Sequence, residues 1–144
     1  MKIASVMDAF RFLPPGFLAL ALAALGLLTI PGNAVAYLDA APPAADQVVL
    51  TERGLAHIHQ RHWPDSDAPG AGKYSPGITD DALRSMISEA VQNGRVRRNT
   101  NGRPGWLFEY NFHRQIGTTI DGGPATRLRV VVNSHSEVIT AFPY

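Results

Sequence analysis

The sequence predicts an α+β domain in which two N-terminal helices pack on one face of an antiparallel β-sheet. Two observations lead to this class. After residue 48, the chain first contains two segments with apolar residues at helical spacing, and then segments in which apolar and polar residues alternate. Helices followed by a run of short strands and turns are typical of α+β domains. A length of 144 residues allows one domain.

The first predicted helix begins after Thr51, a favourable N-cap residue, and ends near His62 because a proline two residues later cannot continue it. Leu55 marks the side of this helix that faces the core. At about 100° per residue, His59 and His62 fall close to that side, whereas His57 falls on the other. Two histidines are therefore expected to face the rest of the domain.

The second predicted helix is capped by Thr79 or Asp80 and ends at Gly94. Its apolar residues have the spacing of an amphipathic helix and are assigned to the core: Leu83, Met86, Ile87, Ala90 and Val91. Between the helices, residues 63–78 form a loop dense in proline, glycine and aspartate. A loop of this length in a small domain is commonly a functional one.

Three strands are predicted in the second half, at residues 106–112, 127–132 and 137–142, and a polar turn joins the last two as a hairpin. We expect a weaker strand over residues 113–119. Glu109 lies on one face of the first strand, and the aromatic residues of the opposite face are assigned to the core: Trp106, Phe108, Tyr110 and Phe112.

Residues 1–36 have the composition of a secretory signal peptide. Lys2 and Arg11 precede an uncharged apolar run at residues 17–30, and residues 34–36 (Ala-Val-Ala) supply a cleavage pattern. The run has 14 residues, whereas a membrane-spanning helix needs roughly 18–20. An uncleaved membrane anchor is the alternative interpretation.

Cleavage would leave a linker rich in alanine and proline at residues 37–47 and a folded domain at residues 48–144. We therefore expect a secreted or periplasmic protein without stable membrane association after cleavage. The chain has no cysteine, so the domain must be stabilised by its core without disulfides.

Charge is unevenly distributed after the predicted signal peptide. Residues 37–81 carry three basic and seven acidic residues, whereas residues 82–144 carry eight arginines and four acidic residues. Lys73 is the single lysine of this part, so the positive charge is almost entirely guanidinium. Guanidinium groups suit bidentate contact with phosphate and stacking on bases. The asymmetry favours an anionic partner such as RNA.

Three histidines, His57, His59 and His62, fall within six residues. Cleavage of RNA without a metal needs a base at the 2′-OH, an acid at the leaving 5′-oxygen and a cation for the phosphorane charge. Histidine supplies the first two near neutral pH, and lysine or arginine supplies the third. A zinc hydrolase is the competing interpretation. The spacing does not match H-E-x-x-H, and cysteine is absent, so we expect neither a metal nor another cofactor.

The order of several short motifs resembles the bacterial EndoU-like toxin nucleases, part of the wider group of barnase, EndoU, colicin D and RelE-like ribonucleases. The motifs are His-Ile-x-x-Arg-His at residues 57–62, Gly-Lys-Tyr-Ser at residues 72–75 and Ile-Thr-Ala-Phe-Pro at residues 139–143. The resemblance covers about residues 48–144. It implies a barnase/EndoU-like fold and a metal-independent endoribonuclease toxin, often acting on tRNA, that leaves a 2′,3′-cyclic phosphate.

The resemblance matches His57 and His62 to the histidine motif of the family, Lys73 to the basic residue after it, and Thr140 to the threonine of the closing strand. Helix geometry instead pairs His59 with His62. Both His57 and His59 therefore remain catalytic candidates, and His62 is common to the two arguments.

The Gly-rich segment, in which the family has a second catalytic histidine, contains none here. His113 or Glu109 is the candidate replacement, since barnase-type enzymes use a Glu–His pair. We expect Tyr144 to orient the substrate together with Thr140. The candidate RNA-binding residues are arginines: Arg61, Arg97, Arg98, Arg103 and Arg129.

Two kinds of partner follow from this interpretation. RNA, with tRNA as the first candidate, is the substrate, and the resemblance implies a cognate immunity protein. The alternative from another class is a non-catalytic exported binding or inhibitor module on the same fold.

Overall fold

The computed structural model describes residues 40–144. The predicted signal peptide and the start of the predicted linker lie outside the described residues. Two α-helices, α2 (Glu52–His62) and α3 (Asp80–Asn93), follow a short 3₁₀ helix, η2 (Ala45–Gln47).

Two antiparallel sheets accompany the helices, and the predicted α+β class is confirmed. The larger sheet has the strand order β2-β3-β6-β7, with β2 (Arg95–Arg98), β3 (Gly105–Asn111), β6 (Arg127–Asn133) and β7 (Val138–Pro143). The smaller sheet has the order β1-β4-β5, with β1 (Lys73–Tyr74), β4 (Gly117–Thr118) and β5 (Pro124–Ala125).

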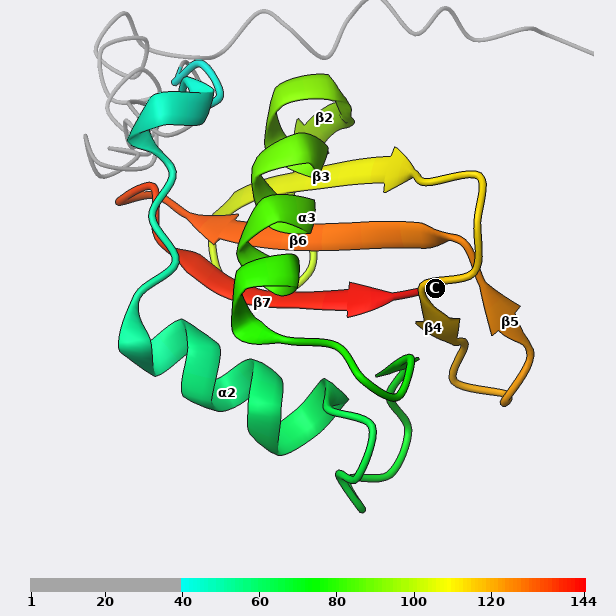
Figure 1. Cartoon of the computed structure of the whole chain (residues 1–144). Helices are drawn as coiled ribbons and strands as arrows, with labels where there is room; N and C mark the ends of the chain where they lie inside the picture. Colours follow the sequence, from blue (N-terminus) through cyan, green and yellow to red (C-terminus); the bar gives the residue numbers. More distant parts are fainter. Residues whose placement is uncertain (1–39) are drawn as a thin grey trace, which may run out of the picture. The chain divides into compact units, whose positions relative to one another are not determined.

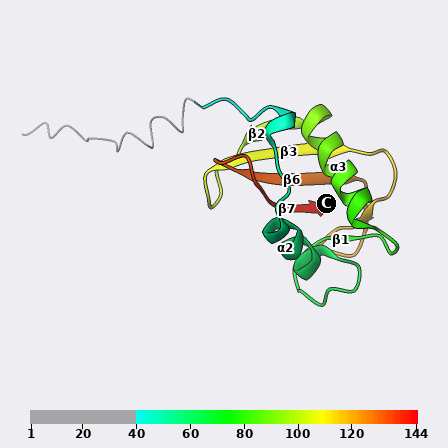
Figure 2. The same ribbon diagram turned by 60° about the vertical axis from the view of Figure 1, so that its left-hand side comes forward.

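Helix α3 lies across one face of the larger sheet, against β3 and β6 (Figure 1). Helix α2 runs beside β7, the strand at the edge of that sheet (Figures 1 and 2). The core lies between the helices and the inward side chains of the strands: Leu55, Ile58, Leu83, Ile87, Phe108, Leu128, Val130 and Ala141 are among its members. On β6, Arg129 alternates with buried Leu128 and Val130 and therefore points to the sheet face opposite α3.

Helix α2 begins and ends as predicted. Thr51 Oγ1 accepts a hydrogen bond from the backbone N–H of Gly54 at 3.2 Å, and the helix ends at His62, before the extended backbone of Trp63. Gly54 allows the helix to approach β7 closely, because a Cβ at this position would lie 2.3 Å from the carbonyl oxygen of Val138. This contact fixes the start of α2 against the first residue of β7.

Helix α3 is also confirmed, and Thr79 rather than Asp80 caps it. Thr79 Oγ1 accepts a hydrogen bond from the backbone N–H of Ala82 at 3.2 Å, and Gly94 follows the last helical residue. The five apolar residues assigned to the core are all buried: Leu83, Met86, Ile87, Ala90 and Val91. Within residues 40–144, no helix has both the length and the apolar character needed to cross a membrane.

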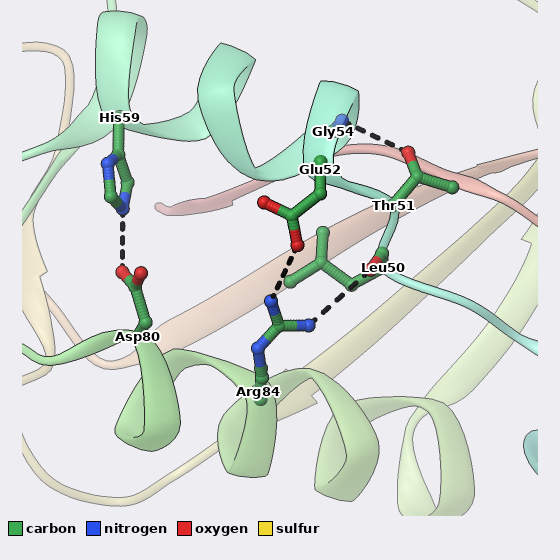
Figure 3. A network of polar contacts seen from close by, with 7 residues as sticks. All are labelled: Leu50, Thr51, Glu52, Gly54, His59, Asp80 and Arg84. Atoms are coloured by element: carbon green, nitrogen blue, oxygen red, sulfur yellow. Dashed lines mark hydrogen bonds and ion pairs between the residues drawn. The ribbon is translucent and has the colours of Figure 1, made fainter.

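Polar contacts join the two helices (Figure 3). His59 Nε2 lies 2.7 Å from Asp80 Oδ1, at the start of α3. Farther along, Arg84 Nη2 lies 3.5 Å from Glu52 Oε1, and Arg84 Nη1 donates to the carbonyl oxygen of Leu50 at 3.4 Å. These side chains are largely exposed, so the contacts orient the helices and contribute little stability.

The three main strands are confirmed to within one residue at each end, and β6 and β7 form the predicted hairpin. The strand predicted over residues 113–119 is wrong for most of its length, since only Gly117–Thr118 form a strand. His113 has a φ of 54°, in the left-handed region, and this interrupts the extended backbone after β3. Strand β2 was not predicted, because three of its four residues are arginines and no alternation of apolar residues marks it.

We predict that Tyr74→Phe raises the free energy of unfolding by about 1 kcal/mol, because an unpaired buried polar group costs roughly 1–3 kcal/mol. Tyr74 is 2% exposed, and its hydroxyl has no hydrogen-bond partner among residues 40–144. Urea denaturation measures the change. The matched control is Tyr110→Phe, which removes a hydroxyl bonded to Glu89 and is expected to lower stability slightly. A loss of stability in Tyr74→Phe would contradict the prediction.

Candidate active site

A cavity of about 550 Å³ lies where the last turns of α2 meet the end of β7. Its walls also include the loop before β1, the turn after β4 and one side chain of β6. The lining residues are His57, Arg61, His62, Gly70, Ala71, Gly72, Thr119, Ile120, Arg129, Phe142, Pro143 and Tyr144. The cavity therefore brings together two of the three helix histidines, two of the predicted RNA-binding arginines and the predicted tyrosine.

His62 is the buried histidine of this cavity, with 6% of its surface exposed. Its ring stacks on that of Phe142, with centroids 5.1 Å apart and an interplanar angle of 21°. Its Nδ1 lies 3.0 Å from the carbonyl oxygen of Gly72. A carbonyl oxygen only accepts hydrogen bonds, so Nδ1 carries a proton, and Nε2 is the unprotonated nitrogen of the neutral ring. His62 thus has the tautomer that a general base requires.

The surroundings of His62 lower its pKa below 6.5. Desolvation by burial is the largest cause, because it disfavours the charged ring. The hydrogen bond to Gly72 acts in the opposite direction, and the nearby charges of His57, Arg61 and Lys73 lower the pKa further. The neutral ring therefore predominates at neutral pH.

His57 is the neighbour of His62 in the cavity. The two ring centroids lie 6.3 Å apart in an edge-on arrangement, and His57 is exposed whereas His62 is buried. Arg61, which precedes His62 on α2, is half-buried and lines the same cavity. One helix therefore supplies two imidazoles and a guanidinium to this space.

Glu109 orients the Arg129 side chain on the open face of the sheet. Arg129 Nε and Nη2 each lie 2.7 Å from Glu109 Oε1, and Arg97 Nη2 lies 3.1 Å from the same oxygen. Desolvation alone would raise the pKa of Glu109, but the hydrogen bonds and charges of Arg97 and Arg129 outweigh it and lower the pKa. Glu109 is therefore an ionised partner of the arginines at neutral pH, and it does not line the cavity.

Tyr144 is held in the cavity wall by contacts with two arginines. The guanidinium carbon of Arg129 lies 4.3 Å from the Tyr144 ring centroid, and that of Arg127 lies 5.2 Å from it. The Tyr144 backbone N–H also donates to the carbonyl oxygen of Arg127 at 2.9 Å. The Tyr144 hydroxyl is buried and has no hydrogen-bond partner among the described residues.

Lys73, which the resemblance matches to the basic residue of the family, is engaged elsewhere. Its Nζ donates to the carbonyl oxygens of Arg61 and Ala68, each at 2.8 Å, and to Ser66 Oγ at 3.1 Å. An ammonium group has three protons, and these contacts use all of them. Lys73 does not line the cavity. Its geometry supports a structural role, tying residues 66–68 to the last turn of α2.

Three further candidates lie away from the cavity. His59 contacts Asp80 and stacks near Trp63, with ring centroids 4.1 Å apart (Figure 3 shows the Asp80 contact). The Thr140 hydroxyl is buried without a hydrogen-bond partner in residues 40–144, and Thr140 is absent from the cavity lining. His113 is exposed after the end of β3. Of the two alternatives for the partner of His62, the structure thus places His57, and not His59, beside it.

The predicted RNA-binding arginines divide into distinct groups. Arg61 and Arg129 line the cavity. Arg98 stacks over Trp106, with its guanidinium carbon 4.4 Å from the ring centroid. Arg103 lies at a second hollow, near the start of α2.

Sequence reasoning missed the turn after β4, which reaches the cavity through Thr119 and Ile120. This turn is brought there by pairing of β4 with β1, in which Thr118 lies opposite Lys73. Both strands have only two residues, too few for an alternating pattern to be recognised. The one signal available in the sequence was an isoleucine directly before an Asp-Gly-Gly turn, and in the structure this residue, Ile120, is 63% exposed.

Residues 40–144 contain no group of three or more histidine, cysteine, aspartate or glutamate side chains arranged to hold a metal ion. Comparisons of the chain with protein-family models, with curated proteins and with solved structures gave no match.

The lowered pKa of His62 predicts a pH-dependent contribution to stability. A histidine whose pKa is lower in the folded chain stabilises the fold above its unfolded pKa, and this stabilisation is lost as pH falls through the folded value. We predict that, as the pH is lowered from about 7.5 to about 5, the free energy of unfolding falls more for the wild type than for His62→Gln. Glutamine keeps a donor for Gly72 but does not titrate.

Urea denaturation of both proteins at the two pH values measures this difference. Carboxylates titrate in both proteins, so their effect cancels in the comparison. A difference that is constant, or that grows in favour of wild type in acid, would show that the folded protein does not disfavour the charged ring.

Proposed function

We propose that this protein is an exported, metal-independent endoribonuclease of the toxin type that cuts RNA in the cavity at the end of α2. The observation that carries the proposal is the state of His62. Its Nδ1–H is held by Gly72, and its unprotonated Nε2 belongs to a side chain that lines the cavity beside Arg129. A neutral histidine in a single tautomer is suited to accept a proton near neutral pH.

In the proposed reaction, His62 Nε2 accepts the proton of the ribose 2′-OH. The 2′-oxygen then forms a bond to the adjacent phosphorus, and the bond from phosphorus to the 5′-oxygen breaks. His57, in its protonated form, donates a proton to the departing 5′-oxygen. The products are a 2′,3′-cyclic phosphate and a 5′-hydroxyl, and the step consumes no water. Both imidazoles line the cavity, with their ring centroids 6.3 Å apart, so a phosphate bound in the cavity could contact both.

The charge that develops on phosphorus requires a cation fixed in advance. Arg129 fits this role, because Glu109 holds its Nε and Nη2 and its guanidinium also packs on the ring of Tyr144. Arg61 adds a second positive charge to the cavity. Tyr144 would then orient the substrate indirectly, through the ring on which Arg129 packs.

The remaining wall of the cavity is apolar and suits a nucleobase. Ile120, Phe142 and Pro143 line it together with the backbone of Gly72. RNA-binding proteins commonly stack unpaired bases on aromatic and apolar surfaces of this kind. Transfer RNA is the first substrate to test, because the family resemblance implies it; the same resemblance supports a cognate immunity protein as a partner.

We predict that His62→Gln lowers the rate of RNA cleavage by roughly 10²–10⁴-fold, the usual contribution of a general acid or base. The assay incubates the purified protein with total tRNA in EDTA and reads fragments and their 3′ ends. The matched control is His59→Gln, which alters the same helix but faces Asp80, and which should retain at least half of the activity.

Cyclic phosphate ends that disappear in His62→Gln and persist in His59→Gln support the proposal. Absence of cleavage by a wild type with a folded circular dichroism spectrum would contradict it and favour a binding module. Cleavage that EDTA abolishes would favour a metal hydrolase.

The pH dependence of the reaction gives an independent prediction. His62 acts as a base only when neutral, so kcat/KM should fall as the pH is lowered, with an acid limb centred below about pH 6.5 because burial lowers the pKa of the ring. Measurement of kcat/KM between about pH 4.5 and about pH 8 on one oligonucleotide substrate tests this. An acid limb centred above pH 6.5 would exclude His62 as the base.

A further inference from the structure

A second hollow, of about 590 Å³, lies at the other end of α2. It is bounded by the start of that helix, the loop between β2 and β3 and the turn between β6 and β7. Arg53, Arg103, His135 and Glu137 are its ionisable residues, together with His57. We call this hollow the Arg53/Arg103 groove.

His57 lines both the groove and the cavity. The two spaces therefore meet at this residue, and together they follow α2 along β7 from one end of the helix to the other. A helix of 11 residues is about 16 Å long. The groove and the cavity together are thus longer than a site for a single nucleotide needs to be.

Within residues 40–144, the lining of the groove carries more positive than negative charge. Arg53 and Arg103 are both exposed, and neither guanidinium forms an ion pair within the part of the chain that is described. Glu137 is the acidic residue of the lining, and its Oε2 accepts a hydrogen bond from Asn133 Nδ2 at 2.8 Å. The start of α2 adds the positive end of its helix dipole. These features suit an anionic chain better than a neutral or cationic ligand.

We propose that the Arg53/Arg103 groove binds the phosphate backbone of single-stranded RNA beside the bond that is cut in the cavity. The identity of the ligand as RNA rests on the proposed function. The substrate is accordingly a strand of several nucleotides that passes His57, with its scissile phosphate at His62 and a flanking phosphate between Arg53 and Arg103. A dinucleotide would occupy the cavity and leave the groove empty.

Binding tests this proposal independently of cleavage. The probe is a fluorescein-labelled 12-nucleotide 2′-O-methyl RNA, which lacks the attacking hydroxyl, and anisotropy gives its Kd at several salt concentrations. We expect the double variant Arg53→Gln/Arg103→Gln to bind roughly tenfold more weakly, and to reduce the slope of log K against log salt by about 1.4, the value for two single-strand phosphate contacts. The charge-matched control is Arg95→Gln/Arg114→Gln, since both residues are exposed and neither lines the groove or the cavity.

The control should keep the wild-type affinity and slope to within a factor of two. The proposal is overturned if the groove variant behaves as wild type does, if the control changes as much as the groove variant, or if wild type does not bind the probe. Binding with the expected slopes by a protein that cuts no RNA would leave the groove proposal standing and contradict the proposed function.

Cleavage of substrates of different lengths provides the second readout. We expect the groove variant to lower kcat/KM for a 12-nucleotide strand with a single ribonucleotide roughly tenfold, and to leave kcat/KM for the dinucleotide at the same bond unchanged within a factor of two. Equal losses on the two substrates would show that Arg53 and Arg103 act at the cavity itself, and would overturn the proposal.

Discussion

The candidate site depends on how closely the loop before β1 packs against the end of β7. A Cβ on Gly72 would lie 2.1 Å from the carbonyl oxygen of Pro143 and 2.8 Å from that of Thr118, so a larger residue would displace the backbone. This close approach also brings the Gly72 carbonyl to 3.0 Å from His62 Nδ1. Gly54 makes a similar contact at the start of α2. A backbone contact at Gly54 therefore positions the start of α2 on β7, and a second contact at Gly72 positions the loop before β1 on the end of the same strand. The tautomer of His62 follows from the position of that loop.

The ionisable residues of the site fall into two groups: some are fixed by ion pairs or by burial, and others are exposed to solvent. Glu109 compensates Arg97 and Arg129, so these guanidinium groups are fixed and partly neutralised on the sheet. Burial keeps the His62 ring neutral. The remaining positive charge lies on exposed side chains along α2 and the loops beside it. A polyanion that meets this surface would thus find exposed cations at the rim and preorganised groups in the interior, as the proposed function requires.

Helices and strands long enough to show the periodic spacing of apolar residues could be predicted from the sequence, and shorter elements could not. Helices α2 and α3 were recognisable because caps, apolar spacing and a following proline or glycine agree with one another. The two-residue strands β1 and β4 have no period of their own, and they form because long-range packing brings them together. Helical spacing alone grouped His59 with His62, whereas the motif grouped His57 with it. The structure separates them because His59 faces the start of α3, and a single helix contains no information about which neighbour lies on each side.

Lys73 illustrates how a motif residue affects a site that it does not touch. The last carbonyl groups of a helix lack partners within the helix, and Lys73 satisfies one of them, on Arg61. It also joins that turn to Ala68 and Ser66, in the loop that leads to Gly72. Its charge is among the causes that lower the pKa of His62. A lysine in this position therefore stabilises the loop that holds the histidine and adds to the effects that keep the ring neutral. Both effects would favour the proposed role of His62 as a base, without any contact between Lys73 and a bound RNA.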